Sequence, residues 1–289
     1  MRFFLITVGQ HTGFIWFRDT GDFIAGMNYI AVMAANSNIK ILAFVLMSNH
    51  LHIVVACDSP EVAFKFTMGF KKLYSMFMRK KYGDKKFLRR VAIDIRELET
   101  DCESVERAIA YVQMNPVAAN ICQTSALYPW GTGDTFFNSK LKGGRILGEM
   151  SARQKTALLR SRQTLPADYV VDEDGFIRPE SYVDIGLTEY IFRSPKRYNF
   201  FLMNSSKVRD KLGDRPSTVP IFSDQSILKA AEDLSRSMYG ARCTKALTAD
   251  QLSNVLRQLR RRFSSNAEQL ARVTRLDARA IADMLEAFR

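Results

Sequence analysis

The chain lacks the long apolar runs and the paired cysteines that mark several classes of protein. No apolar run approaches the roughly 20 residues of a membrane span, and the apolar start at residues 3–8 is too short for a signal peptide. The four cysteines are scattered and form no Cys-x-x-Cys pair, so neither a zinc knuckle nor a disulfide framework is indicated. We therefore expect a cytoplasmic protein with no membrane partner.

Acidic residues are the minority among the charged residues: 30 Asp and Glu stand against 42 Lys and Arg, a net charge of +12. Such an excess favours a polyanionic partner. It is concentrated at residues 65–90, where the basic residues are Lys65, Lys71, Lys72, Arg79, Lys80, Lys81, Lys85, Lys86, Arg89 and Arg90. Phe66, Phe70, Tyr74 and Phe77 recur there at helical spacing, which is more typical of a helix's core face than of a base-stacking platform. The charged face of this helix can contact phosphates.

Histidine is scarce too, and two of the three histidines, His50 and His52, lie two residues apart. In a strand such residues project from the same face, so the two imidazoles converge. Converging imidazoles suit a divalent cation. The alternative is a chance pairing on a half-exposed strand.

The hydrophobic pattern predicts strands at 3–8, 39–47, 51–56 and 87–95 and helices at 22–36, 60–82 and 104–114. We expect Ser104 to cap the last of these helices. The order β-α-β-β-α-β-α predicts an α+β fold, a ferredoxin-like antiparallel sheet with helices on one face. We divide the chain into a first domain at 1–140, a connecting region at 141–225 and a helical region at 226–289.

Two later segments have patterns of their own. The connecting region contains a short basic helix at 152–163 and a hairpin predicted to turn at Asp174–Gly175. Residues 268–285 predict a helix, a three-residue break and a second helix, the pattern of a helix-turn-helix. Arg275 and Arg279 then lie near the start of the candidate recognition helix. The alternative is a small helical bundle, because no glycine marks the turn.

Tyr111 and Asn115 are four residues apart and share one face of the predicted helix, which Pro116 is expected to end. A tyrosine hydroxyl is almost fully protonated at neutral pH, so it reacts only beside a charge or with a metal-polarised electrophile. A cation on the two histidines would supply this, with the Asn115 oxygen as a third ligand. A purely structural tyrosine is the alternative.

Residues 48–55, Ser-Asn-His-Leu-His-Ile-Val-Val, and residues 111–119, Tyr-Val-Gln-Met-Asn-Pro-Val-Ala-Ala, together resemble the single-tyrosine HUH transposases, and above all the REP-associated tyrosine transposases. Tyr-Pro-Trp at 128–130 matches a further element of that family. The resemblance covers about residues 1–140, which it implies to be a ferredoxin-like HUH catalytic domain.

The resemblance implies that His50, His52 and Asn115 hold Mg²⁺ or Mn²⁺ and that Tyr111 is the nucleophile. It implies cleavage of single-stranded DNA beside hairpins through a 5′-phosphotyrosine intermediate, followed by strand transfer, by a monomer or a homodimer. Ser48 replaces the family's usual proline, and 86–90 replaces a glutamine-containing segment, departures that bear on substrate binding.

Two other functions stay open at this point. A domesticated, non-catalytic DNA-binding regulator would bind hairpins even without His50 and His52. A metal-dependent nuclease, in which water attacks and Tyr111 is structural, would cleave DNA without forming an adduct. The complete motif set favours catalysis by Tyr111.

Overall fold

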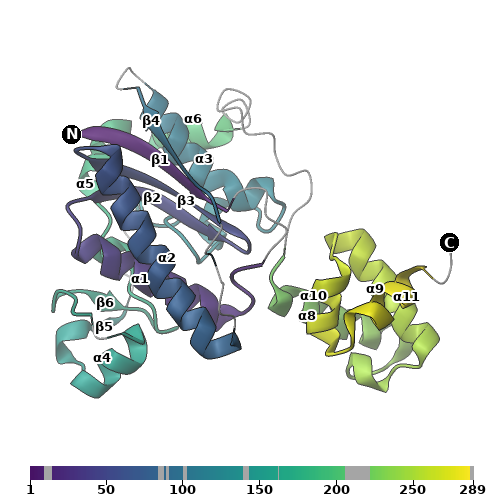
Figure 1. Ribbon diagram of the computed structural model, residues 1–289. Coiled ribbons are helices and arrows are strands. Elements are labelled where there is room, and N and C mark those ends of the chain that lie inside the picture. Colours follow the sequence, from purple (N-terminus) through teal and green to yellow (C-terminus); the bar gives the residue numbers. More distant parts are fainter. Residues whose placement is uncertain are drawn as a thin grey trace.

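Figure 1 shows the computed structural model, which describes residues 1–9, 15–83, 88, 91–99, 103–138, 143–161, 163–205 and 222–286. The first part of the chain forms a four-stranded antiparallel sheet in the order β2-β3-β1-β4. Its elements are β1 (Arg2–Val8), α1 (Thr20–Ala35), β2 (Lys40–Met47), β3 (His50–Cys57), α2 (Pro60–Tyr82), β4 (Ile93–Leu98) and α3 (Ser104–Ala118). The order confirms the predicted α+β class and the β-α-β-β-α-β-α succession.

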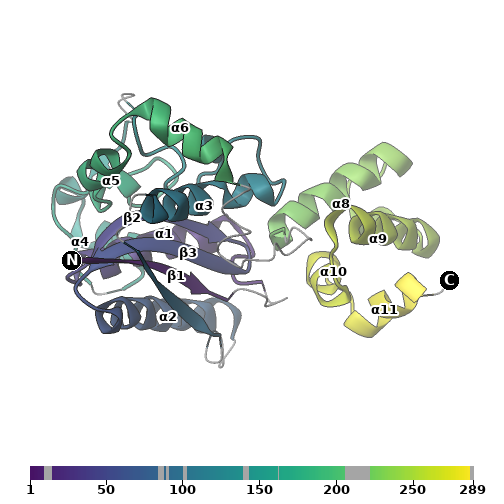
Figure 2. The same ribbon diagram turned by 90° about the horizontal axis from the view of Figure 1, so that it is seen from above.

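Both faces of the sheet are covered. Every residue of β3 from Leu51 to Cys57 is buried, so each of its two faces must pack against other elements. Seen from above in Figure 2, α2 lies on one face and α3 on the other, and α1 packs against α2. The prediction of helices on one face only is therefore wrong for α3, because a strand that is apolar on both faces needs cover on both.

The predicted element ends are partly wrong. The span of α2 is confirmed at Pro60–Tyr82, closed by Gly83 in the left-handed region at φ 75°. Strand β4 begins at Ile93, later than predicted, because the pairing with β1 begins where Ile93 lies opposite Val8, the last residue of β1. Of the predicted 87–95 strand, residues 87, 89 and 90 lie outside the described ranges. Glu103, not Ser104, precedes the first turn of α3.

The region after α3 packs against the sheet domain. It holds β5 (Arg145–Ile146), α4 (Ala152–Leu159), β6 (Val170–Val171), α5 (Ile185–Phe192) and α6 (Pro195–Met203). Phe192 and Phe201 belong to the main hydrophobic core. The turn predicted at Asp174–Gly175 is confirmed, with the Asp172 N–H donating to the Phe176 carbonyl over 2.8 Å, although β6 pairs chiefly with β5.

The C-terminal helices have a hydrophobic core of their own, formed by α8 (Asp224–Tyr239), α9 (Ala249–Phe263), α10 (Ala267–Thr274) and α11 (Ala278–Glu286). Helices α10 and α11 confirm the predicted helix, three-residue break and helix. Arg275 takes the left-handed conformation at φ 61° that a glycine would adopt more cheaply. Within the described ranges, no helix has both the length and the apolar character needed to cross a membrane.

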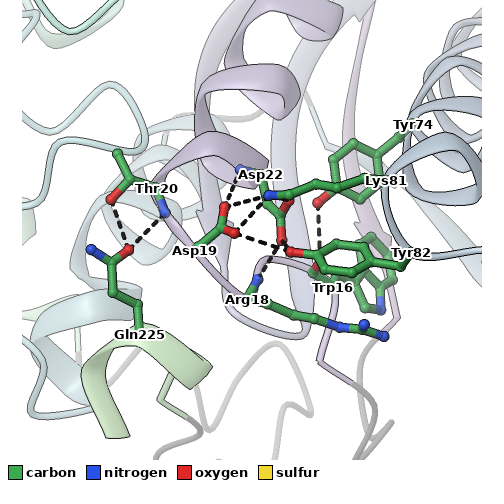
Figure 3. Close-up of polar contacts among 9 residues, drawn as sticks. All are labelled: Trp16, Arg18, Asp19, Thr20, Asp22, Tyr74, Lys81, Tyr82 and Gln225. Atoms are coloured by element: carbon green, nitrogen blue, oxygen red, sulfur yellow. Dashed lines mark hydrogen bonds and ion pairs between the residues drawn. The ribbon is translucent and has the colours of Figure 1, made fainter. Parts of the chain in front are cut away.

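A polar network joins the end of α2, the start of α1 and the start of α8 (Figure 3). The fully buried Asp22 carboxylate accepts hydrogen bonds from Lys81 Nζ at 2.7 Å, from the Arg18 N–H at 2.8 Å and from the Tyr82 hydroxyl at 3.0 Å. Gln225 Oε1 accepts from the Thr20 N–H and hydroxyl, both at 2.8 Å. The C-terminal helices are thus tied to the same end of α1 that Lys81 holds.

The outer edge of β2 is covered by the segment that contains the Tyr-Pro-Trp motif. The Leu46 N–H donates to the Trp130 carbonyl over 2.8 Å, and the Tyr128 hydroxyl donates to the Leu46 carbonyl over 2.7 Å. Gly131 forms an antiparallel bridge with Val45. The motif is therefore part of the sheet's packing, because it satisfies backbone groups that an edge strand would leave open.

Gly131→Ala is expected to destabilise the protein by about 1–3 kcal/mol, the usual cost of overpacking. A Cβ there would lie 2.6 Å from the Phe44 carbonyl oxygen, which is backbone and cannot turn aside. The urea midpoint should fall. Gly143→Ala is the matched control, because a Cβ at Gly143 meets nothing within 4 Å; equal midpoints for both variants would contradict the close approach.

Candidate active site

His52 lies at the centre of the candidate site, on the face of the sheet that α3 covers. Its Nε2 is 3.2 Å from the Tyr111 hydroxyl oxygen, and its Nδ1 is 3.0 Å from Thr7 Oγ1 on the neighbouring strand β1. The side chain is 1% exposed and Tyr111 is 3% exposed. Residues 59 apart in sequence are thus brought into hydrogen-bond distance by the packing of α3 on β3.

Burial, and secondarily the neighbouring His50, lower the pKa of His52 well below its ordinary value. His52 is therefore neutral at pH 7, with one ring nitrogen protonated. Each ring nitrogen lies beside a hydroxyl, which can donate or accept, and in the tautomer protonated on Nδ1 this atom donates to Thr7 Oγ1 while Nε2 accepts from the Tyr111 hydroxyl. Thr7 thereby holds the ring in the orientation that leaves Nε2 facing Tyr111.

His50 is held in a similar way. Its Nδ1 is 2.8 Å from Asn49 Oδ1, an oxygen that can only accept, so Nδ1 carries a proton and donates it. The His50 and His52 rings lie edge to face with centroids 4.8 Å apart. The alternation expected for the strand is confirmed, because both imidazoles share a neighbourhood. Asn49 lies in the tight turn between β2 and β3, which places its side chain beside the ring.

The helix that carries Tyr111 does not end where it was predicted to. Helix α3 continues through Pro116 to Ala118, so the expectation that Pro116 ends it is wrong. A proline's φ is compatible with a helix, and the cost is the missing hydrogen bond to the Val112 carbonyl four residues earlier. Asn115 lies one turn after Tyr111 and is half-buried. Among the described residues its side chain donates no hydrogen bond to either histidine.

Of the three predicted ligands, the two histidines are arranged as the ligands of a divalent cation would be. Both imidazoles have Nδ1 within hydrogen-bond distance of a protein oxygen, an arrangement that metal-ligating histidines show. Within the described residues, however, no group of three or more His, Cys, Asp and Glu side chains could hold a metal ion. The two histidines fit such an ion, and Asn115 as a third ligand stays a prediction.

Only some of the basic residues predicted to contact nucleic acid are exposed on the surface. Lys65, Lys72, Arg79 and Lys80 are exposed on α2. Lys71 is 8% exposed and donates to the Val91 carbonyl over 2.6 Å, and burial lowers its pKa. It therefore lies on the core side, since helical spacing puts it one turn after the buried Thr67. Lys85, Lys86, Arg89 and Arg90 lie outside the described residues.

Lys81 is engaged within the protein, because its ammonium is bonded to both Asp19 and Asp22. Arg275 and Arg279 are exposed at the break before α11 and at its start, as the helix-turn-helix prediction requires. Contact of these two arginines with nucleic acid stays a prediction.

Thr7 and Asn49 are the site residues that the sequence patterns did not indicate. Thr7 is directly opposite His52 in the β1–β3 register, which no local pattern discloses. Asn49 immediately precedes His50, and its position beside a histidine in a turn was the available signal.

No family model matches this chain, and no curated protein matches it. Among solved structures, a REP-associated tyrosine transposase bound to a REP hairpin is similar, with a TM-score of 0.37 and 15% sequence identity. The match covers 45% of this chain and 76% of that chain. At this level of similarity, neither the activity nor the ligand of that protein is carried over to this chain.

Proposed function

We propose that the protein cleaves single-stranded DNA and transfers the strand, with Tyr111 as the nucleophile and Mg²⁺ or Mn²⁺ as cofactor. The observation that carries the proposal is the contact of the Tyr111 hydroxyl with His52 Nε2 at 3.2 Å, with His50 beside it. The motif resemblance to single-tyrosine HUH transposases and the net charge of +12 support it further.

Each residue has a defined part in this reaction. The Tyr111 oxygen forms a bond to the phosphorus of a phosphodiester as the bond to the 3′ oxygen breaks, which leaves a 5′-phosphotyrosine and a free 3′-OH. The phenol loses one proton and the leaving oxygen gains one, so the step is balanced. His50 and His52, with Asn115, would hold the metal ion, which supplies polarisation of the phosphate. Thr7 and Asn49 orient the imidazoles, and the packing of α3 on β3 keeps the Tyr111 hydroxyl beside the Nε2 atom that would hold the ion.

The test is to incubate the full chain with end-labelled single-stranded hairpin oligonucleotides, with Mg²⁺ or Mn²⁺ or with a chelator, and to separate the products under denaturing conditions. We expect a covalent protein–DNA adduct that requires the divalent ion. Cleavage without an adduct would favour the metal-dependent nuclease. Hairpin binding without cleavage in any metal would favour the non-catalytic regulator.

Thr7→Val is expected to slow adduct formation by about 10–100-fold, the usual loss when the partner of a metal-ligating histidine is removed. Valine keeps the size of the side chain but cannot form the hydrogen bond with His52 Nδ1, so the ring loses the contact that orients it. We would measure the rate of adduct formation at saturating DNA and the metal concentration that gives half of that rate. A purely structural role of Thr7 would change neither quantity. Thr7→Ser, which keeps the hydroxyl, should restore most of the rate; failure of this rescue would remove Thr7 from the site.

A further inference from the structure

A groove of 1530 Å³ lies between α1, α2 and α4, away from the candidate active site. Its volume exceeds the roughly 300–1,000 Å³ of small-molecule sites, which favours an extended ligand. In Figure 2, α2 lies on the face of the sheet opposite α3 and therefore opposite Tyr111. We call this feature the α1–α2–α4 groove.

The charge of the groove has one sign. Among the described residues, five cations line it and no carboxylate does: Lys72, Lys80 and Lys81 from α2, and Arg153 and Arg160 from α4 and its end. Lys81 is paired with Asp19 and Asp22. The other four are exposed, and none of them forms an ion pair within the described part of the chain. Four such cations on two facing walls make a site for repeated negative charge.

The floor of the groove is apolar. Leu73, Met76 and Phe77 from α2 and Met33 from α1 line it, and Met76 is 52% exposed. Gly69 allows Met33 to approach α2, because a Cβ at Gly69 would lie 2.3 Å from the methionine's terminal carbon. The Arg160 guanidinium sits over the Phe77 ring at 4.9 Å, so a cation joins the floor to the wall. A polymer with both flat apolar groups and anions matches these surfaces.

We propose that the α1–α2–α4 groove binds single-stranded DNA, with bases against the apolar floor and phosphates against Lys72, Lys80, Arg153 and Arg160. The choice of DNA as the polyanion rests on the proposed function. Single strands expose base faces that apolar side chains can cover, while basic walls follow the backbone. Because the groove and Tyr111 lie on opposite faces of the sheet, the groove holds the strand and does not take part in cleavage.

The experiment measures binding of the full chain to fluorescein-labelled (dT)₂₀ by anisotropy at several salt concentrations, with a chelator present so that no cleavage occurs. Lys72→Gln/Arg153→Gln removes one cation from each wall. We expect weaker binding and a fall in the slope of log Kd against log salt of about 0.7 for each phosphate that the variant no longer neutralises. Met76→Ala is expected to weaken single-strand binding without a change of slope, and to leave duplex binding unchanged.

Arg193→Gln/Lys196→Gln is the matched control, because it removes the same charge from exposed positions outside the groove. If the slope falls as much in this control as in the groove variant, the proposal is overturned. It is also overturned if the groove variant binds DNA like the wild type, which is the result expected if the groove takes an acidic peptide. If no adduct forms in any protein but the slope falls only in the groove variant, the proposed function fails and the groove assignment stands.

Discussion

Tyr111→Phe is expected to abolish the covalent protein–DNA adduct while leaving the protein folded and able to bind DNA. Phenylalanine keeps the aromatic ring, whose centroid lies 5.1 Å from that of the His52 ring, but lacks the oxygen that would bond to phosphorus. The absence of the hydrogen bond to His52 should cost only about 0.5–1.5 kcal/mol of stability. Adduct would be measured on denaturing gels with labelled hairpin oligonucleotides, and binding by anisotropy.

The matched control is Tyr128→Phe. Tyr128 is also buried and its hydroxyl is also hydrogen-bonded, to the Leu46 carbonyl at 2.7 Å, but it lies away from the histidines in the segment that covers β2. This variant should still form adduct. An adduct in Tyr111→Phe would refute the nucleophile assignment outright, and loss of adduct in both variants would point to a structural cause.

Lys81→Met is expected to destabilise the protein by about 3 kcal/mol, because removal of one partner of a buried ion pair leaves an uncompensated charge. The Asp22 side chain is 0% exposed but the Lys81 side chain is 28% exposed, so the loss should be smaller than for a pair in which both partners are fully buried. Denaturant midpoints and slopes would be measured. Lys80→Met is the matched control, since Lys80 is exposed at the preceding position of the same helix and has no ion pair within the described residues.

The same network gives the sign of the pH dependence. Burial, partly opposed by Lys81, raises the pKa of Asp22 above its ordinary value. A carboxyl with a raised pKa in the folded state binds a proton before the unfolded chain does, so its stability penalty shrinks as the pH falls through that pKa. Without Lys81 the pKa rises further, and the deficit of Lys81→Met should shrink towards acidic pH. At neutral pH the double variant Lys81→Met/Asp22→Asn should lose less stability, relative to the wild type, than Lys81→Met alone. An equal loss in both variants would contradict the buried Asp22 charge as its cause.

Local patterns account for the helix and strand order, because proline, glycine and alternating or helical spacing act within a few residues. The bounds of α2 follow from Pro60 and Gly83. What local patterns do not decide is the face of the sheet that a helix covers. Strand β3 is buried on both sides, so its hydrophobic pattern is nearly continuous and gives no preference for one face.

The candidate site was predictable from local spacing, whereas the residues that support it were not. His50, His52 and Tyr111 could be named from spacing and from a motif resemblance. Thr7 depends on the register of β1 against β3, and the engagement of Lys71 and Lys81 depends on contacts with Val91 and with the start of α1. Interactions of this kind are long-range, and a charge count assigns such lysines to the surface.

We expect the two parts of α3 on either side of Pro116 to open to solvent at different free energies. The turn after Tyr111 is short of one backbone hydrogen bond, because Pro116 has no N–H to donate to Val112, whereas Ala119 still donates to the Asn115 carbonyl over 3.0 Å. Local opening starts where the ladder is weakest. Slow amide exchange should therefore extend through the turn of Tyr111 and stop near Asn115, so that Asn115 can reorient while the tyrosine keeps its position.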